Sequence, residues 1–475
     1  MAAQARQITV YLIKPSKYDD DGYVLRYRKG FLPSNTLACL AGLTEDIRRS
    51  KLLGNALHIS VHLCDDTVER IDVSRIARSA RHHGNRTIVC LAGVQTNQFP
   101  RAADLAFQFR AAGVEVLIGG FHVSGAIAMA DALPDEIRSL LDAGVHVVAG
   151  EVEDRWGDIL ADVRDGTLKP MYNFLNEPPD LRHQPIPEIN KRYLRHFITD
   201  NFGTIDCSRG CPFHCEFCSV SSFFGKSYRT RPVSGVIEEL EALRKESAFL
   251  FLVDDNLIGN RPYAGTLYKE MTPLKFKWAS HAPLNFVKDD ELLRLAAQSG
   301  CTALFVGFES LVYENLSIMG KLTNVGISPR EAVKKFHDHG IGILASFILG
   351  YDGDTPDTFD RILDFCDRTK IDGALFPILT PYPGTPLRER LQREGRILTN
   401  QWDLYDMEHV TFLPKGMTPE KLQDGFERLN SSFYSWRSIF RRLFKIHRSV
   451  QIFGPMNLGF KKAWERVRTG QRPVT

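Results

Sequence analysis

The 475-residue chain contains no apolar run of about 18 residues, the length that a transmembrane helix requires. Its N-terminus has a short apolar stretch without a small-residue cleavage site, so we expect a first strand there rather than a signal peptide. The net charge of +3 gives no overall attraction to nucleic acid, and we expect no nucleic-acid partner. Internal repeats and low-complexity segments are also absent. These absences favour a globular, cytoplasmic protein of several domains.

Cysteine is scarce, with nine residues, and its distribution excludes a disulfide scaffold. Five cysteines stand apart beside apolar segments, where we expect small buried hydrophobic side chains: Cys39, Cys64, Cys90, Cys301 and Cys366. The other four fall within the segment TIDCSRGCPFHCEFCSV, residues 204–220. This crowding needs an explanation of its own.

Residues 1–165 alternate strand-like and helical patterns, which predicts a Rossmann-like, doubly wound parallel sheet with helices on both faces. Ligands of such sheets bind outside the carboxyl ends of the strands. Glycines stand at several of these ends, namely Gly93, Gly119, Gly120 and Gly150. The expected strands are 8–14, 56–63, 87–94, 114–120 and 145–150, with helical patterns at 101–113 and 127–144.

Residues 166–199 are rich in proline and polar groups and are typical of a linker. The alternation of strands and helices then restarts over residues 200–395, with strands expected at 202–208, 248–255, 276–282, 303–310, 342–350 and 373–380. Six strands predict a partial (β/α)6 barrel of the TIM type, an α/β fold whose chemistry gathers at the carboxyl ends of the strands. Residues 396–475 form a basic, mostly helical C-terminal extension.

Three of the crowded cysteines, Cys211, Cys215 and Cys218, have the spacing C-x3-C-x2-C directly after an expected strand. Thiolates are soft ligands that suit iron–sulfur clusters and zinc. Three thiolates leave one iron of a [4Fe–4S] cluster without a protein ligand, and that iron can bind the amino and carboxylate groups of S-adenosylmethionine (SAM). The alternative is a zinc site in a non-catalytic or regulatory protein, which would need Cys207 or His214 as the fourth ligand.

The trio and the strand before it resemble the radical SAM superfamily, and the resemblance covers residues 202–390. It implies an enzyme that cleaves SAM reductively at a [4Fe–4S] cluster held by the trio, and thereby abstracts a hydrogen atom from its substrate. Phe217 would shield the SAM adenine. The family's Gly-Gly-Glu motif is replaced by Val253-Asp254-Asp255-Asn256, in which either Asp254 or Asp255 would accept hydrogen bonds from the SAM amino group.

Three further positions match SAM-binding segments of the family. Glu309 in VGFES would approach the SAM ribose or carboxylate, although it could also serve as a helix N-terminal charge. Gly350 would form the glycine turn beside the adenine, or an ordinary turn. Ser280, which ends the third strand with His281, would contact SAM or substrate, or would only pack at the barrel mouth.

The first 165 residues resemble the cobalamin-binding domain that is fused to many radical SAM enzymes. The resemblance implies three groups of cobalamin contacts: the loop Gln95, Thr96 and Asn97; the tail segment Gly119, Gly120 and His122; and the last loop, Gly150 and Glu151. The family's D-x-H-x-x-G motif, whose histidine ligates cobalt, is missing from residues 14–22. Cobalt therefore has no such ligand, or the domain has lost the cofactor and serves packing or substrate binding.

The C-terminal segment 402–422 resembles an extension of cobalamin-type radical SAM proteins that include hopanoid-related methyltransferases. Residues 435–448 place Trp436, Ile439, Phe440, Leu443 and Phe444 at helical spacing among arginines. Such a basic amphipathic helix can make a peripheral contact with an anionic membrane. The alternative is a helix that packs across the barrel with solvated arginines.

The family resemblance implies cobalamin-dependent methylation of an unactivated carbon. A cobalamin-type radical rearrangement or cyclisation without methylation remains the alternative reaction. The expected partners are a small-molecule or lipid substrate and an external electron donor such as flavodoxin or ferredoxin.

Overall fold

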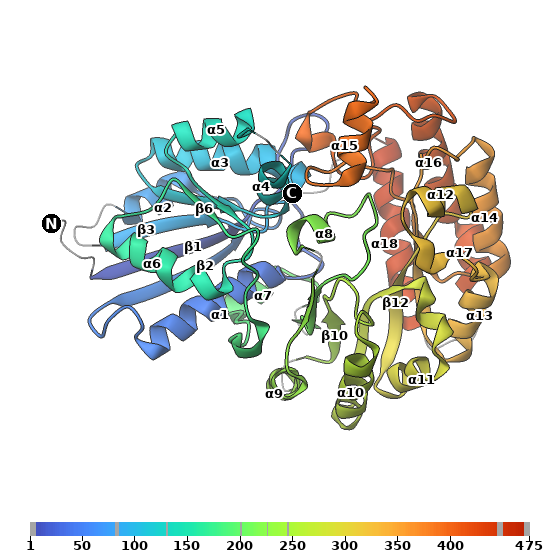
Figure 1. The fold of residues 1–475 in the computed structure, drawn as a ribbon, viewed down its shortest axis with the longest axis horizontal. Helices are drawn as coiled ribbons and strands as arrows, with labels where there is room; N and C mark the ends of the chain where they lie inside the picture. Colours follow the sequence, from blue (N-terminus) through green and yellow to red (C-terminus); the bar gives the residue numbers. More distant parts are fainter. Residues whose placement is uncertain are drawn as a thin grey trace.

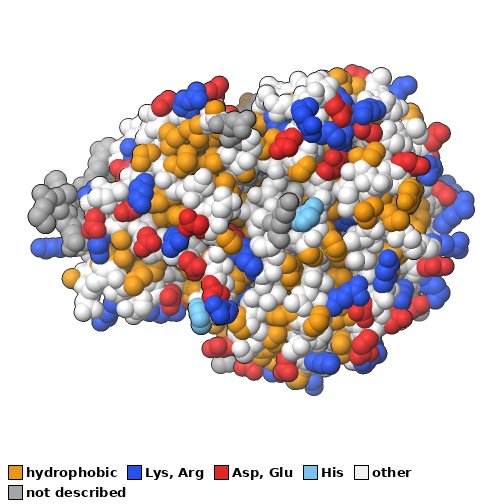
Figure 2. Space-filling view, viewed as in Figure 1, with side chains coloured by type: hydrophobic (Ala, Val, Ile, Leu, Met, Phe, Trp, Pro, Cys, Tyr) orange, Lys and Arg blue, Asp and Glu red, His pale blue; other side chains and the backbone are white. Residues whose placement is uncertain are grey.

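The computed structural model describes residues 6–80, 85–129, 132–199, 202–225, 227–244, 247–443 and 450–469. It has two lobes that lie side by side, each built on a parallel sheet of six strands, with the short helix α8 (Val220–Phe223) between them (Figure 1). Charged side chains of both signs are interspersed over the face shown in Figure 2. Among the described helices, none is long and apolar enough to span a membrane.

The N-terminal lobe is doubly wound, as predicted. Its sheet has the order β2-β1-β3-β4-β5-β6, and every neighbouring pair is parallel. Strand β1 places Ile8 and Val10 in the core on one face of the sheet and Ile13 in the core on the other. The strands are β1 (Gln7–Lys14), β2 (His58–Asp65), β3 (Asn85–Leu91), β4 (Glu115–Gly119), β5 (His146–Ala149) and β6 (Met171–Asn173). The helices are α1 (Asn35–Ser50), α2 (Val73–Ala80), α3 (Phe99–Ala111), α4 (Phe121–Ala128), α5 (Asp135–Asp142) and α6 (Trp156–Asp165).

The C-terminal lobe is the predicted partial barrel. Its sheet has the order β14-β13-β12-β11-β10-β7, so β7 and β14 form the two open edges. The strands are β7 (Phe202–Ile205), β10 (Phe249–Leu252), β11 (Lys277–Pro283), β12 (Cys301–Glu309), β13 (Gly342–Phe347) and β14 (Gly373–Leu375). The helices between them are α9 (Val233–Leu243), α10 (Arg261–Met271), α11 (Asp290–Gln298), α12 (Tyr313–Ile318), α13 (Pro329–Asp338) and α14 (Asp357–Thr369). One large apolar core lies between this sheet and its helices.

Two connecting regions place the functional residues. The segment expected to be a linker supplies β6 to the first sheet, and then η3 (Leu181–His183) and α7 (Lys191–Leu194). After β7, the strands β8 (Ser208–Gly210) and β9 (Tyr228–Thr230) pair as an antiparallel ribbon. The loop with the three cysteines and α8 lies between these two strands, so the ribbon forms its base.

The C-terminal segment consists of α15 (Pro386–Arg393), η7 (Trp402–Leu404), α16 (Pro419–Phe433), α17 (Trp436–Leu443) and α18 (Val450–Thr469). Helix α17 packs on the barrel through Ile439 and Arg442, whose guanidinium donates to the carbonyl oxygens of Ile371 and Asp372. Trp436 and Phe440 face outward. Residues 444–448 of the predicted amphipathic helix, including Phe444, lie outside the described residues.

Candidate active site

The three cysteines of the predicted cluster motif line a single cavity of about 330 Å³ at the carboxyl ends of β10, β11 and β12. Burial raises the pKa of Cys215, and it raises the pKa of Cys218 to about 12. Both side chains are therefore neutral thiols until a metal displaces their protons. Three thiols around one cavity are a donor set that suits an iron–sulfur cluster with one open iron.

The two residues considered as a fourth ligand differ from the trio. The side chain of Cys207 is fully buried in the apolar core of the barrel, and its carbonyl oxygen accepts a hydrogen bond from Tyr263. His214 is not part of the wall around the trio's cavity. In the described part of the chain, no three His, Cys, Asp or Glu side chains converge as the ligands of a single metal ion would.

Two aspartates with different environments follow the end of strand β10. Asp254 is fully buried and accepts hydrogen bonds from the Ser208 hydroxyl and from the Cys207 amide at 3.2 Å, while burial raises its pKa to about 7. Asp255 lines the cavity and accepts from the Gly210 amide at 3.0 Å, and burial raises its pKa to about 6. Asp254 therefore ties the end of β10 to β8, and Asp255 is the carboxylate that faces the cavity.

Asn256, which the sequence analysis did not single out, lies directly at the cysteine trio. Its Nδ2 donates to Sγ of Cys211 at 3.4 Å. Its Oδ1 is buried at the same cavity and has no hydrogen-bond partner in the described structure. A buried acceptor without a partner is costly, so this oxygen is suited to a donor on a bound molecule.

Glu309 and Lys321 form a buried ion pair in the same cavity. The Lys321 ammonium lies 2.9 Å from Oε1 of Glu309. Burial disfavours the charged lysine, but the Glu309 carboxylate and Cys215 more than offset this, so the pKa of Lys321 is raised. Glu309 has a positive φ of 65°, a conformation that costs a non-glycine residue about 1–3 kcal/mol and is often found at functional sites.

Gly307 makes room for this carboxylate. A Cβ atom at Gly307 would overlap the carboxylate of Glu309, which folds back over the strand. The register between β12 and β13 also shifts between Gly307 and Glu309. The glycine of the predicted VGFES motif therefore has a steric role, because any side chain in its place would occupy the space of the Glu309 carboxylate. Lys321, which follows α12, gave no signal in the sequence.

The other predicted SAM-binding residues divide into two groups. Phe217 lines the cavity, with its ring edge-on to Tyr351 at 6.4 Å between centroids. Ser280 does not line it, because its hydroxyl is buried and donates to the Leu252 carbonyl at 2.8 Å. At Gly350 a Cβ atom would overlap Leu422 of α16, so this glycine accommodates packing. His281, beside Ser280, does line the cavity, and burial lowers its pKa.

A second cavity, of about 350 Å³, lies between the lobes at the carboxyl ends of β3, β4 and β5. Of the residues predicted to contact cobalamin, Gly119, Gly120, Gly150 and Glu151 line it. Gly120 has φ of 148°, and a Cβ atom there would overlap the amide nitrogen of Val94. The glycine therefore allows two segments of backbone to meet at the cavity wall.

Four of the residues predicted to contact cobalamin do not line this cavity: Gln95, Thr96, Asn97 and His122. His122 is fully buried between the rings of Phe99 and Trp402, at centroid distances of 4.0 and 4.9 Å. Neither of its ring nitrogens has a hydrogen-bond partner in the described structure, and burial, aided by Arg388, lowers its pKa to about 3. The segment η7 therefore covers this side of the lobe.

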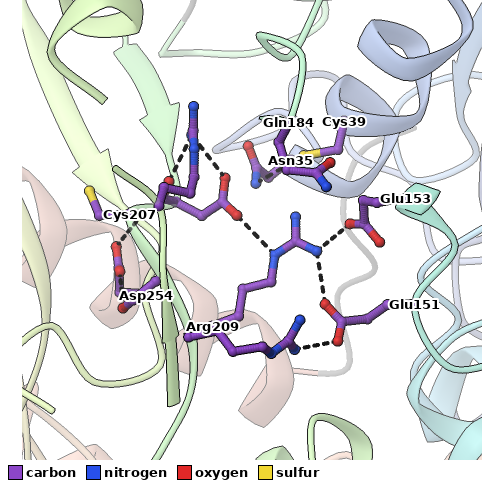
Figure 3. A network of polar contacts seen from close by, with 12 residues as sticks. Asn35, Cys39, Glu151, Glu153, Gln184, Cys207, Arg209 and Asp254 are labelled. Atoms are coloured by element: carbon purple, nitrogen blue, oxygen red, sulfur yellow. Dashed lines mark hydrogen bonds and ion pairs between the residues drawn. The ribbon is translucent and has the colours of Figure 1, made fainter. Parts of the chain in front are cut away.

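The two cavities adjoin each other, because Val253 and Asp255 line both. The polar part of the second cavity is an ion network in which Arg209 reaches Glu151 and Glu153 (Figure 3). Its apolar part includes Phe121, whose ring stacks on that of Phe223 at 4.4 Å. A molecule bound in one cavity is thus separated from a molecule in the other by the end of a single strand.

Comparison with known proteins identifies the family. The model of the radical SAM superfamily matches residues 205–366. A bacteriochlorophyllide d C-12(1)-methyltransferase of Chlorobaculum tepidum is 32% identical over 348 residues, which cover 70% of this chain and 72% of the relative. The chain belongs to the radical SAM superfamily. The predicted enzyme class is confirmed, together with the [4Fe–4S] cluster and SAM that this superfamily employs.

Other similarities extend over more of this radical SAM enzyme. The hopanoid C-2 methylase of Rhodopseudomonas palustris is 28% identical over 387 residues, covering 78% of this chain and 70% of the relative. The structure of the radical SAM methyltransferase TsrM from Kitasatospora setae, with cobalamin and a [4Fe–4S] cluster bound, has a TM-score of 0.61 at 17% identity, covering 82% of this chain and 78% of that one. This likeness confirms the predicted fold. Residues 385–468 match a domain of unknown function, DUF4070.

Proposed function

We propose that this radical SAM enzyme is a cobalamin-dependent methyltransferase that acts on an unactivated carbon of a hydrophobic substrate. The observation that carries the proposal is the pair of cavities that share Val253 and Asp255. One cavity holds the cysteine trio, and the other lies at the carboxyl edge of a doubly wound sheet, where such sheets bind ligands. Two cofactors bound in these cavities would lie on either side of one shared wall. A substrate could then be close to both, as transfer of a methyl group to it requires.

The residues of the barrel cavity suit a cluster and SAM. Cys211, Cys215 and Cys218 would hold the cluster. Asp255 and Oδ1 of Asn256 would accept hydrogen bonds from the SAM ammonium, and Lys321, oriented by Glu309, would bind its carboxylate. Phe217 supplies an apolar wall for the adenine. When bound, the cluster and SAM supply a hydrogen-abstracting radical, and cobalamin supplies a transferable methyl group.

Cobalamin would lie in the second cavity, against the backbone at Gly119, Gly120 and Gly150. Among the described residues that form this wall there is no histidine. We therefore propose that no histidine of this chain ligates cobalt there, in agreement with the missing D-x-H-x-x-G motif. The N-terminal lobe would then hold the cofactor mainly by backbone contacts and shape.

The substrate site would lie where the two cavities meet. Apolar side chains from both lobes, including Phe121, Phe223 and Phe224, line the second cavity and would exclude water from a radical formed beside it. Two relatives act, by their names, on bacteriochlorophyllide and on hopanoids. We propose a hydrophobic small molecule or lipid as the substrate of this enzyme too.

The test is made in cells that express the protein and grow on methionine with a deuterated methyl group. We expect a hydrophobic extract to contain a compound with a labelled methyl group on carbon, which is absent from cells with the Cys211→Ala variant. The purified, reconstituted protein should also bind hydroxocobalamin, seen as a shift in its absorbance. A product that depends on Cys211 but carries no label would instead support a cyclisation or rearrangement, and protein that contains zinc without sulfide would refute the proposal.

Two finer assignments concern the surroundings of the enzyme. All nine cysteines are free, and such thiols persist in a reducing compartment, which supports a cytoplasmic location. Reductive cleavage of SAM needs an external electron donor, and we propose a flavodoxin or ferredoxin. Reduction of the cluster by either protein in place of dithionite, followed by formation of 5′-deoxyadenosine, is the measurement that checks this assignment.

We further propose that α17 touches an anionic membrane surface. Trp436 and Phe440, 52% and 59% exposed, stack outward at 5.9 Å, and the exposed Arg437 lies between them in sequence. Exposed aromatic residues among basic ones are typical of interfacial helices. The Trp436→Ala/Phe440→Ala variant should lose binding to vesicles that contain phosphatidylserine, whereas Tyr313→Ala, at an equally exposed aromatic residue, should keep it. Absence of binding between the wild-type protein and such vesicles would contradict the assignment.

A further inference from the structure

The cluster loop is fastened at its base to the other lobe. The ribbon β8–β9 carries an arginine on each strand, Arg209 and Arg229, and residues 211–227 between the strands include all three cysteines of the trio. The guanidinium of Arg209 lies 2.9 Å from Oε1 of Glu151, and that of Arg229 contacts Oε2 of the same carboxylate. Glu151 belongs to the N-terminal lobe, where it directly follows Gly150 at the cavity wall. Both ends of the cluster loop are therefore held by one carboxylate of the opposite lobe (Figure 3).

The surroundings make this contact stronger than a surface ion pair. The side chain of Glu151 is 6% exposed, and those of Arg209 and Arg229 are 14% and 17% exposed. Charge-assisted bonds of this kind are little screened by solvent, and both oxygens of Glu151 are occupied. An exposed pair of the same type in the N-terminal lobe, Arg155 with Glu177, has exposures of 46% and 55%.

Arg209 also connects the contact to the barrel. Its Nε donates to Asp206 at 2.9 Å, and it reaches Glu153 of the N-terminal lobe as well. Asp206 follows β7, and its carbonyl oxygen accepts a hydrogen bond from Arg231 at 2.9 Å. The network therefore runs from the loop after β5 through the ribbon into the edge strand of the barrel, and Arg229 adds a hydrogen bond to the carbonyl oxygen of Pro179 at 3.1 Å, in the segment expected to be a linker.

We propose that Glu151 is a positioning residue that holds the cluster loop in register with the cobalamin cavity of the N-terminal lobe. The sequence analysis assigned Glu151 to cobalamin, but its two carboxylate oxygens are engaged by Arg209 and Arg229. Glu151 fixes the position of the ribbon β8–β9 relative to the N-terminal lobe, and the ribbon in turn fixes the position of the three cysteines. The role of this register in methyl transfer rests on the proposed function, whereas the fastening of the loop does not.

Hydrogen exchange of the reconstituted holoenzyme, followed by mass spectrometry, tests the proposal. In Glu151→Ala, we expect amides of residues 205–231 to exchange at least tenfold faster, because Arg209 and Arg229 both lose the carboxylate that they share and Arg209 retains only its pairing with Glu153 across the lobes, while β1 and β12 keep their rates. Glu151→Gln, which keeps the shape and one neutral acceptor, should lie between Ala and wild type. This variant keeps the test decisive if Glu151→Ala does not fold.

The matched control is Glu177→Ala, which removes the exposed carboxylate that pairs with Arg155 and should leave residues 205–231 unchanged. Iron release to a chelator should be several-fold faster in Glu151→Ala and unchanged in the control. Arg229→Met should add less to Glu151→Ala than it adds to the wild type, since both substitutions remove the Arg229–Glu151 ion pair and the hydrogen bond from Arg229 to the Pro179 carbonyl is the further loss. Unchanged exchange of residues 205–231 in both Glu151 variants would overturn the proposal. Failure of the wild type to bind hydroxocobalamin would instead refute the proposed function and leave the anchor standing.

Discussion

Asn256 shows how one side chain can serve two neighbours at the residue scale. Its amide nitrogen donates to the thiol of Cys211, and its amide oxygen is buried without a partner in the described structure. Hydrogen bonds to the sulfur ligands of an iron–sulfur cluster stabilise the more negative, reduced state. The side chain therefore joins the thiol ligand to the place where we propose the SAM ammonium.

We predict that Asn256→Ala makes the reduction potential of the cluster more negative by about 40 mV. This corresponds to a loss of about 1 kcal/mol for one electron, the usual worth of one hydrogen bond. A redox titration of the reconstituted protein, followed by electron paramagnetic resonance, measures the potential. Asn285→Ala is the control, because Asn285 also has a buried Oδ1 without a partner in the described structure but lines the neighbouring surface pocket. Equal potentials in wild type and Asn256→Ala would contradict the prediction.

His122 makes the protein sensitive to acid. Its pKa is about 3 in the folded state and near 6.5 when exposed, so between these values the unfolded chain binds a proton that the folded chain does not. Stability is therefore lost as the pH falls through this window, by about 2 kcal/mol at about pH 5. His122→Phe, which keeps a ring between Phe99 and Trp402, should remove this loss in urea unfolding curves. His183→Phe, at an exposed histidine, should leave the loss of stability at low pH unchanged. If this loss is also unchanged in His122→Phe, the explanation is ruled out.

At the scale of the element, β12 combines a strained end with a small residue. Glu309 has a left-handed conformation, and its carboxylate lies over Gly307, where no side chain interferes. Lys321 then pairs with this carboxylate at the cavity. The end of the strand thus orients the Glu309 carboxylate, two residues beyond Gly307, toward the ammonium of Lys321, which follows α12.

We predict that Gly307→Ala weakens SAM binding at least tenfold, about 1.4 kcal/mol, because the new methyl group displaces the Glu309 carboxylate. Anaerobic calorimetry with SAM measures the affinity, and the iron and sulfide content should stay at the wild-type level. Gly265→Ala on α10 is the matched control, since a Cβ atom there meets Leu292 only at an ordinary 3.7 Å. Wild-type affinity in Gly307→Ala would show that the Glu309 carboxylate does not order the SAM site.

The sequence predicted most of the elements, because burial imposes periods of 2 and 3.6 residues on strands and helices. Its failures have local causes. The expected helix over 127–144 instead covers only the end of α4 and the whole of α5, with Pro134 directly before α5. Strand β6, with three residues, is too short to show a period. The positions of the three cysteines at a strand end followed from their spacing and the strand before them.

The sequence could not predict which candidate side chains face the cavities. Asp254 and Asp255 are neighbours with opposite directions, and only the packing of β8 shows that Asp254 is engaged by Ser208. Ser280 and Gly350 turned out to be occupied by contacts inside the lobe. Lys321 lies after α12 and pairs with Glu309, which precedes this helix, so no sequence pattern marks the contact. The roles assigned to all of these residues remain predictions.

At the scale of the whole molecule, the C-terminal segment joins the two lobes a second time. Trp402 packs on the ring of His122, and the guanidinium of Arg388 lies 4.7 Å from the centroid of Trp402. Asp406 pairs with Lys17 of the N-terminal lobe at 2.8 Å. The chain therefore returns to its first lobe after it has completed the barrel.

We predict that Trp402→Ala lowers the stability of the N-terminal lobe by about 2 kcal/mol, less than the cost of removing a fully buried tryptophan, because Trp402 is half-buried. Scanning calorimetry should then resolve two unfolding transitions that lie closer together in the wild type. Trp436→Ala, at the exposed tryptophan of α17, should leave the profile unchanged. If the calorimetric profile of Trp402→Ala were identical to that of the wild type, the contact of η7 with the N-terminal lobe would not contribute to stability.

The wall that both cavities share has a consequence for how such enzymes diverge. Since Val253 and Asp255 belong to both cavities, a substitution there changes two sites at once. Residues that line only one cavity, such as Phe121 or His281, can change independently. We therefore expect that new substrate preferences arise in the outer walls of the cavities, while the end of β10 evolves slowly.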